Sequence, residues 1–87
     1  PFEIESVIME LPYVVECGVS AAPDEIRGQV VKASIVLTKD TVPSDEIKKE
    51  IQTYVKEHTA PYKYPRIVEF KESLPKTTSG KIQRNKL

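Results

Sequence analysis

Hydrophobic residues recur at helical spacing in two segments of the chain. The first segment has acidic residues in its opening turn, and Pro12 should stop the helix. The second follows Pro43, with Ser44 as the expected N-cap and acids facing the helix dipole, and Pro61 should end it. The apolar positions are Ile4, Val7, Ile8 and Leu11 in the first segment and Ile47, Ile51, Tyr54 and Val55 in the second. Each segment therefore predicts an amphipathic helix with one buried stripe.

The remaining hydrophobic segments favour three strands. Residues 13–22 (YVVECGVSAA) and 29–37 (QVVKASIVL) are rich in small and β-branched side chains, and residues 23–28 (PDEIRG) between them have turn composition. Because this connection is short, the two strands should pair in antiparallel fashion. Residues 66–71 (RIVEFK) predict a third strand, and residues 74–81 (LPKTTSGK) predict a loop. The order helix–strand–strand–helix–strand–loop predicts an α+β domain in which helices flank a small three-stranded sheet.

The composition fits one small domain. The chain has 87 residues, of which 39% are hydrophobic and 30% are charged. A domain of this size is too small to enclose a pocket for both a nucleotide and an acyl chain, which argues against a self-sufficient enzyme. No apolar run is long enough to span a membrane, and the N-terminus lacks the pattern of a signal peptide. Because the first residue is Pro rather than Met, we expect the natural chain to continue upstream.

The residues that commonly bind metals are sparse. Cys17 is the only cysteine, so the sequence excludes an internal disulfide and a cysteine-based zinc site. Since Cys17 lies in an apolar stretch, we expect a packed core thiol rather than a reactive one. His58 has no partner at metal-ligand or catalytic spacing and is expected to be a helix-end residue. The sequence therefore predicts no metal site.

Charge is distributed unevenly along the chain, although its net value is zero. Residues 1–55 carry 5 Lys and Arg against 10 Asp and Glu, whereas residues 56–87 carry 8 against 3. The last fifteen residues contain no acid and four basic side chains: Lys76, Lys81, Arg84 and Lys86. We expect a short basic helix from Ile82. A basic tail with Ser, Thr and Gly suggests an anionic ligand such as phosphate, whereas the lack of interleaved aromatic residues gives nucleic-acid binding little support.

The tail segment LPKTTSGKI, residues 74–82, resembles a phosphate-binding P-loop only superficially. Pro75 stands where a P-loop needs Gly, and Ile82 stands where it needs Ser or Thr. Gly80 and the small hydroxyl residues would instead form a mobile loop that ends in Lys81, whose compact charge on a flexible stem can reach into a neighbouring cleft. Lys76, at the start of the loop, is expected to be a surface charge.

Four segments together resemble the adenylate-forming superfamily, which comprises acyl-CoA synthetases, luciferases and the adenylation domains of peptide synthetases. LPKTTSGKIQR resembles the terminal signature of that superfamily, and PFEIESVI resembles the helix that follows its interdomain hinge. PYVVECGVSAAPDEIRGQVVKASIVL resembles its strand pair. APYKYPRIVEF resembles the form carried by short- and medium-chain acyl-CoA synthetases. The segments follow the family's order and spacing, so the resemblance covers residues 1–87 as one C-terminal domain.

The resemblance implies an enzyme that activates a carboxylic acid with MgATP to acyl-AMP and pyrophosphate, and then transfers the acyl group to the thiol of CoA. In such enzymes a lysine of the small domain neutralises the charge that accumulates around the α-phosphorus. The resemblance implies that Lys81 is this catalytic lysine and that Lys81 and Gly80 contact ATP or AMP, with Gly80 permitting a close approach. Thr77, Thr78 and Ser79 would shape the loop rather than react.

For the second half-reaction, the resemblance implies that the small domain rotates and presents its opposite face. Lys81 then leaves the active site, and other residues line the CoA channel. The implied CoA contacts are Arg27, Lys56, Tyr64 and Arg66. Arginine suits phosphate because its planar group donates two hydrogen bonds at once.

The hinge, the nucleotide-binding loops and the acyl pocket of the family would lie upstream of Pro1. We therefore expect a large N-terminal domain as the partner, holding most of the ATP and Mg²⁺, and no activity from the 87-residue chain alone. We expect a cytoplasmic location, or the mitochondrial matrix in a eukaryote. Acetylation of Lys81 would remove the charge that adenylation needs and would provide regulation.

Two alternatives remain open. The acyl acceptor could be the phosphopantetheine of a carrier protein, or the product could be a free adenylate; APYKYPR favours CoA. Alternatively, the chain could be a module that binds or regulates and retains the fold without catalysis. Retention of Gly80 and Lys81 argues against this alternative.

Overall fold

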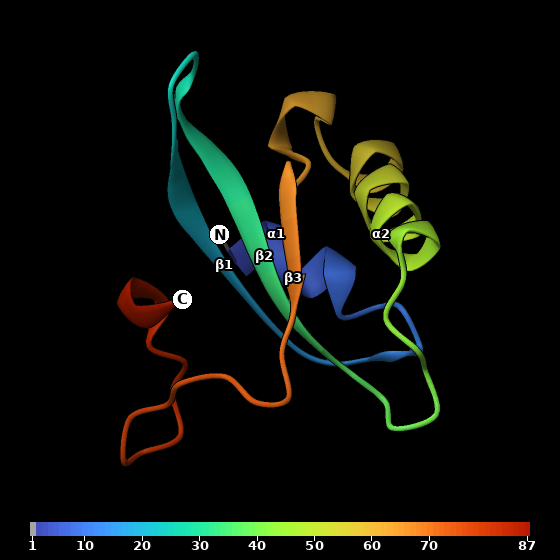
Figure 1. Cartoon of the computed structure of the whole chain (residues 1–87), viewed down its shortest axis with the longest axis vertical. Coiled ribbons are helices and arrows are strands. Elements are labelled where there is room, and N and C mark those ends of the chain that lie inside the picture. The colour runs from blue at the N-terminus through green and yellow to red at the C-terminus, as the bar shows by residue number, and fades with distance from the viewer. Residues whose placement is uncertain (1) are drawn as a thin grey trace.

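A computed structural model of the chain describes residues 2–87. The three strands form one sheet in the order β1-β2-β3, in which β1 and β2 are antiparallel and β2 and β3 are parallel (Figure 1). The elements are α1 (Phe2–Ile8), β1 (Val14–Asp24), β2 (Gly28–Leu37), α2 (Asp45–His58), the 3-10 turn η1 (Pro61–Lys63), β3 (Ile67–Phe70) and the 3-10 turn η2 (Arg84–Lys86). The predicted α+β class, the element order and the antiparallel pair are confirmed.

Both helices pack on one face of the sheet and form the hydrophobic core with it. Alternation along each strand directs every second side chain to this face. The core contains Cys17 and Val19 of β1, Ala33 and Ile35 of β2, Val68 of β3, Ile4, Val7 and Ile8 of α1, and Ile51 and Val55 of α2. Burial of one such aliphatic side chain contributes about 1.5–3 kcal/mol, so the core fixes where the two helices lie.

The ends of the helices are set by local hydrogen bonds. The Ser44 side chain accepts from the backbone N–H of Ile47 at 3.2 Å, which confirms the predicted N-cap of α2. The helix ends at His58 because Thr59 adopts an extended backbone conformation, although its N–H still donates to the Val55 carbonyl at 2.9 Å. The first helix ends at Ile8, earlier than the proline stop predicts, and the chain then turns.

The C-terminal tail, residues 74–87, lies at the opposite face of the sheet. A Cβ atom added to Gly18 of β1 would lie 2.7 Å from Leu87 Cδ1 and 3.2 Å from Ile82 Cγ2. Gly18 pairs with Ser34 in β2, so the two residues share this face, and Ser34 is fully buried. The predicted basic helix from Ile82 is a single 3-10 turn.

The β1-β2 turn and the tail lie at opposite ends of the molecule. Its longest dimension is 34 Å, and along that axis the turn lies at the top of Figure 1, whereas the loop of the tail lies at the bottom left. Within residues 2–87, no helix is both long enough and apolar enough to cross a membrane.

Candidate functional site

The loop of residues 76–82, called the Lys81 loop below, is a closed turn rather than an open segment. Lys76 and Ile82 form an antiparallel bridge at its base, and the Thr77 N–H donates to the Lys81 carbonyl at 2.8 Å. The Gly80 N–H donates to the Thr77 carbonyl at 3.0 Å. Gly80 has a φ of 88°, a region that side chains with a Cβ rarely adopt, so this position favours glycine for its backbone conformation.

The hydroxyl groups of the loop make contacts within it. Thr77 Oγ1 accepts from the Lys81 N–H at 3.2 Å and lies 3.0 Å from Ser79 Oγ. These contacts agree with the loop-shaping role expected for Thr77 and Ser79. The loop therefore presents Lys81 from a defined backbone turn.

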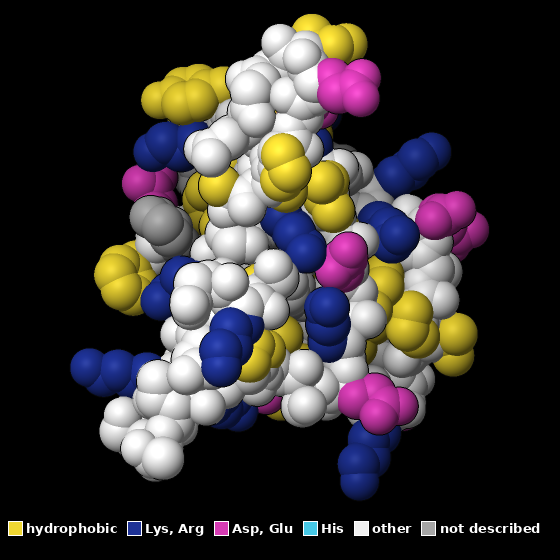
Figure 2. All heavy atoms as spheres, turned by 60° about the vertical axis from the view of Figure 1, so that its left-hand side comes forward, with side chains coloured by type: hydrophobic (Ala, Val, Ile, Leu, Met, Phe, Trp, Pro, Cys, Tyr) yellow, Lys and Arg dark blue, Asp and Glu magenta, His cyan; other side chains and the backbone are white. Residues whose placement is uncertain are grey.

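The two lysines of the loop have different surroundings. Lys76 is partly exposed and forms a close ion pair with Glu16 of β1. Lys81 is exposed, and the ion pairs formed by residues 2–87 involve other side chains. Figure 2, which brings the tail side forward, shows Lys and Arg side chains that lie apart on this face rather than in one continuous patch. Lys81 is thus available to an anion outside the domain.

The segment after Lys81 is tied to α1 through a carboxylate. Glu5 accepts hydrogen bonds from Arg84 Nε at 2.8 Å, from Arg84 Nη2 at 2.5 Å and from the Val19 N–H at 2.7 Å. Burial alone would raise the pKa of Glu5, but the bonds from Arg84 and Val19 outweigh it and hold the pKa below its ordinary value. Glu5 is therefore an ionised, largely buried acceptor.

The four predicted CoA residues come together at the other end of the domain. Arg27, Tyr64 and Arg66 line one groove of about 550 Å³ between the β1-β2 turn and η1. Lys56 Nζ lies 4.2 Å from the centre of the Tyr64 ring, and Arg66 Cζ lies 4.9 Å from it. The Tyr64 ring therefore makes cation–π contacts with basic groups from α2 and from the residue directly before β3.

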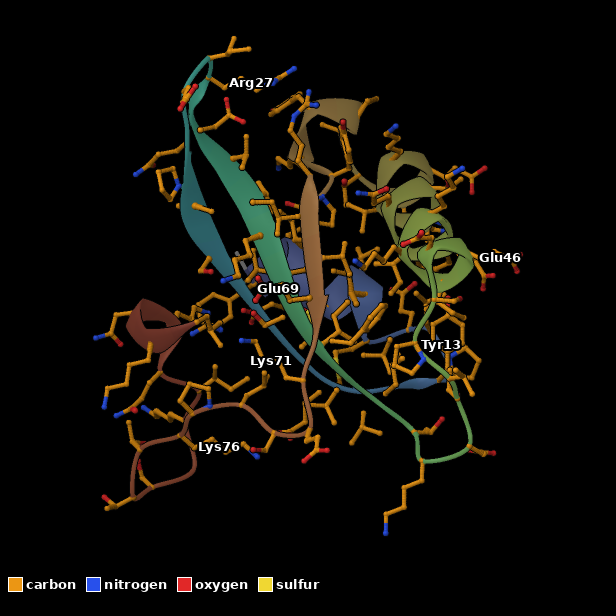
Figure 3. All side chains as sticks on the ribbon, in the orientation of Figure 1. Tyr13, Arg27, Glu46, Glu69, Lys71 and Lys76 are labelled. Carbon is orange, nitrogen blue, oxygen red and sulfur yellow. The ribbon has the colours of Figure 1, made fainter. Side chains whose placement is uncertain are left out.

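Local turn chemistry positions Arg27. Asp24 Oδ1 accepts from the backbone N–H groups of Ile26 and Arg27, each at 2.9 Å. These two bonds, with the Arg27 charge, lower the pKa of Asp24. Asp24 lies 4.0 Å from the Arg27 guanidinium, which remains at the tip of the turn. Figure 3 shows Arg27 at this tip and Lys76 in the tail, far apart.

Three further polar side chains line this groove, none of them predicted from the sequence. Tyr62 is 80% exposed, Gln29 is the second residue of β2, and Ser20 carries a buried hydroxyl without a hydrogen-bond partner among residues 2–87. Tyr62 lies in the APYKYPR segment, so its aromatic character next to basic residues was a signal that could have been used. No sequence pattern indicates that Ser20 lines a groove, because the groove is formed by segments that are distant in the sequence.

Two expectations about single residues agree with the structure. Burial raises the pKa of the Cys17 thiol to about 12, and the Glu5 charge adds to this, so Cys17 is a core thiol. His58 is the last residue of α2 and stacks on Tyr54 with ring centres 3.9 Å apart. Residues 2–87 contain no group of three His, Cys, Asp or Glu side chains that could hold a metal ion.

Comparison with known proteins identifies the fold and its family. A family model described as "AMP-binding enzyme C-terminal domain" matches residues 3–81. The chain belongs to this family. It is 58% identical to the mitochondrial acyl-coenzyme A synthetase ACSM3 of Mus musculus over 89 aligned residues, which cover 100% of this chain but 15% of the mouse protein.

Solved structures agree with this assignment. The acyl-CoA synthetase of Brucella canis superimposes with a TM-score of 0.94 and 39% identity, over 98% of this chain and 16% of that one. The anthranilate CoA ligase AuaEII, solved with anthranoyl-AMP, gives a TM-score of 0.91 and 43% identity, over 99% of this chain and 17% of that one. The AMP-binding C-terminal domain therefore spans about one sixth of the length of these relatives.

Proposed function

We propose that this domain is the C-terminal part of an AMP-forming acyl-CoA synthetase and that its two ends serve the two half-reactions. The observation that carries the proposal is the separation of the tail loop, which carries the exposed Lys81, from the β1-β2 turn, where Arg27 and Arg66 line a groove. Membership of the AMP-binding C-terminal family supports it, as do relatives named acyl-CoA synthetases. Residues 1–87 would belong to the small C-terminal domain, and a larger domain would bind ATP and the acid.

In the first half-reaction, Lys81 would face the α-phosphate of ATP while the carboxylate attacks it. The new bond joins the carboxylate oxygen to the α-phosphorus, and pyrophosphate leaves with the electron pair of the broken P–O bond. Negative charge then accumulates on the oxygens around phosphorus, and a lysine positioned there beforehand stabilises this state. The turn closed by Thr77 and Gly80 would supply that position.

In the second half-reaction, the groove would hold CoA while its thiol attacks the acyl carbon and AMP leaves. Arg27 and Arg66 would bind phosphate groups, and Lys56 would add charge beside Tyr64. A hydrogen bond to a charged group contributes about 1.5–3 kcal/mol, so the loss of one arginine should weaken CoA binding by roughly 10- to 150-fold.

Mg²⁺ would accompany ATP and stabilise charge on its phosphates. We assign no Mg²⁺ ligand to this domain, since residues 2–87 provide no suitable cluster of donors. We propose a cytoplasmic location, or the mitochondrial matrix if the source is a eukaryote, as the mitochondrial mouse relative suggests.

The test uses the full-length protein with Lys81→Ala, and Lys86→Ala as a matched control because Lys86 is an exposed lysine of the same tail. Acyl-AMP formation from acid and MgATP is measured separately from thioester formation from supplied acyl-AMP. Lys81→Ala should abolish the first reaction and spare the second, and Lys86→Ala should spare both. If Lys81→Ala retains adenylation, the domain does not supply the catalytic lysine and a non-catalytic module is favoured.

A second assay tests the CoA groove and the identity of the acceptor. Arg66→Ala should raise the KM for CoA in thioester formation and leave adenylation unchanged, whereas Lys49→Ala, an exposed lysine on α2, serves as the control. CoA and a phosphopantetheinylated carrier protein are offered in parallel. Transfer to the carrier alone would refute CoA as the acceptor.

A further inference from the structure

The Lys81 loop is held to the rest of the domain at both of its ends. On the side before the loop, Lys76 pairs with Glu16 of β1. On the side after it, Arg84 reaches Glu5 of α1 with two donors. The Gln83 N–H donates to the Pro75 carbonyl at 2.9 Å and closes the base. The position of the turn therefore depends on these attachments as well as on its internal bonds.

The attachment through Glu5 is the more buried of the two. Glu5 is 8% exposed, and it satisfies the backbone N–H of Val19 on the edge strand β1 at the same time as it binds Arg84. Arg84 follows Lys81 by three residues, so a two-donor contact there constrains the loop backbone directly. A planar guanidinium bound through two donors also fixes direction, which a single contact does not.

Gly18 provides room for the tail at the same level of the sheet. Leu87 and Ile82 approach the position that a Cβ atom would occupy, at 2.7 Å and 3.2 Å, although φ at Gly18 lies outside the region that requires glycine. Glycine therefore leaves space for these side chains, and its backbone conformation does not require it here. A Cβ atom at this position would displace the ends of the Leu87 and Ile82 side chains.

We propose that Glu5 and Arg84 are positioning residues for Lys81, holding the loop where its ammonium group meets the reacting phosphate. This inference rests on the proposed role of Lys81 in adenylation. Displacement of a reacting group by about 1 Å can cost roughly 10²-fold in rate, so a loosened attachment should be visible in the chemical step. The same attachment has no role when Lys81 has left the active site.

The main test compares Glu5→Gln with Glu3→Gln in the full-length protein. Glu5→Gln keeps an acceptor for the Val19 N–H but removes the charge that Arg84 binds. Glu3 lies on the same helix and pairs instead with Lys63 at 3.3 Å, so Glu3→Gln makes the same chemical change away from the tail. Glu5→Gln should lower kcat for acyl-AMP formation by about 10- to 100-fold with the KM for ATP little changed, and should leave thioester formation from acyl-AMP within about twofold.

Variants on the tail provide an independent approach if Glu5→Gln folds poorly. Arg84→Gln should reproduce the loss, and the double variant should lose no more than either single variant, because both changes remove one interaction. Arg84→Lys keeps the charge but loses the two-donor geometry. Its rate of acyl-AMP formation should lie between those of the wild type and Arg84→Gln. In the 87-residue chain, hydrogen exchange at the Thr77 and Gln83 amides should quicken in Glu5→Gln and not in Glu3→Gln.

The outcomes separate this inference from the proposed function. If Lys81→Ala abolishes adenylation while Glu5→Gln and Arg84→Gln leave it intact, the positioning role is refuted and the proposed function stands. If Lys81→Ala leaves adenylation intact, the proposed function itself fails. Equal losses in both half-reactions would indicate general destabilisation and would also overturn the positioning role. A selective loss of adenylation, with faster exchange in the loop, supports it.

Discussion

Removal of the Glu5 side chain should destabilise this domain more than removal of any exposed acid on the same helix. Glu5→Ala deletes the acceptor of three hydrogen bonds, of 2.5, 2.7 and 2.8 Å. It leaves the backbone N–H of Val19 and the Arg84 guanidinium without their partner. Glu3→Ala removes one exposed ion pair with Lys63.

The expected loss of stability follows from how far the hydrogen-bonded groups are buried or exposed. A hydrogen bond to a charged group contributes about 1.5–3 kcal/mol, but water can replace part of it at Arg84, whose side chain is 33% exposed. We expect Glu5→Ala to cost about 2–4 kcal/mol and Glu5→Gln, which can still accept from Val19, about 1–2 kcal/mol. Glu3→Ala should cost less than about 1 kcal/mol. For a domain of this size, 1 kcal/mol corresponds to about 4–8 °C in Tm.

The stability that Glu5 contributes should also depend on pH, and it should decrease in acid. The pKa of Glu5 is lowered in the folded chain, so its ionised form stabilises the fold above its unfolded pKa, about 4.3, and this contribution is lost as the pH falls through the folded value. The difference in stability between the wild type and Glu5→Gln should be constant from about pH 5 to 7 and should narrow below about pH 4.3. Comparison of the two proteins cancels the titration of groups that they share, such as Asp24 and Glu69.

Urea unfolding of the 87-residue chain, followed by circular dichroism at several pH values, measures these quantities. Equal costs for Glu5→Ala and Glu3→Ala would refute the reasoning, because burial and the three bonds would then have no weight. A difference between wild type and Glu5→Gln that widened in acid would contradict the lowered pKa.

Three further predictions concern other parts of the domain. Ile51→Ala removes a fully buried side chain and should lower the free energy of unfolding by about 2–5 kcal/mol in urea titrations, whereas Thr53→Ala on the exposed face of α2 should change it little. Gly80→Ala forces a side chain into positive φ and should cost about 1–2 kcal/mol or shift the loop, which would be seen as altered amide chemical shifts confined to the tail. Cys17 should resist alkylation at pH 8 in the folded chain and react once the chain is unfolded, and rapid native labelling would contradict its burial.

The secondary structure was predictable because it depends on short-range patterns. The stripe at Ile51 and Val55, the Ser44 cap and the turn around Asp24 are each encoded within a few residues, and all three are found in the structure. The errors concern the end of the first helix and the structure after Ile82. The first helix ends at Ile8, and the region after Ile82 forms one 3-10 turn rather than a helix.

The candidate residues were predictable only in part. Lys81 and Gly80 stand out in a local motif, and the CoA residues follow from segments that resemble a known family. Glu5 and Arg84 were not singled out as a pair, because 79 residues separate them and each alone resembles an ordinary surface charge.

The sequence by itself determined the class of the domain, its helices and strands, its solitary core thiol and the motif that contains Lys81, because periodicity, caps and turn residues act over short distances. The tertiary structure decided which residues meet. It brought Arg27, Tyr64 and Arg66 to one groove, and it joined the tail to the edge of the sheet through Glu5 and Gly18. The physical reason is that charge pairing and packing act through space, and only the folded sheet and helices set those distances.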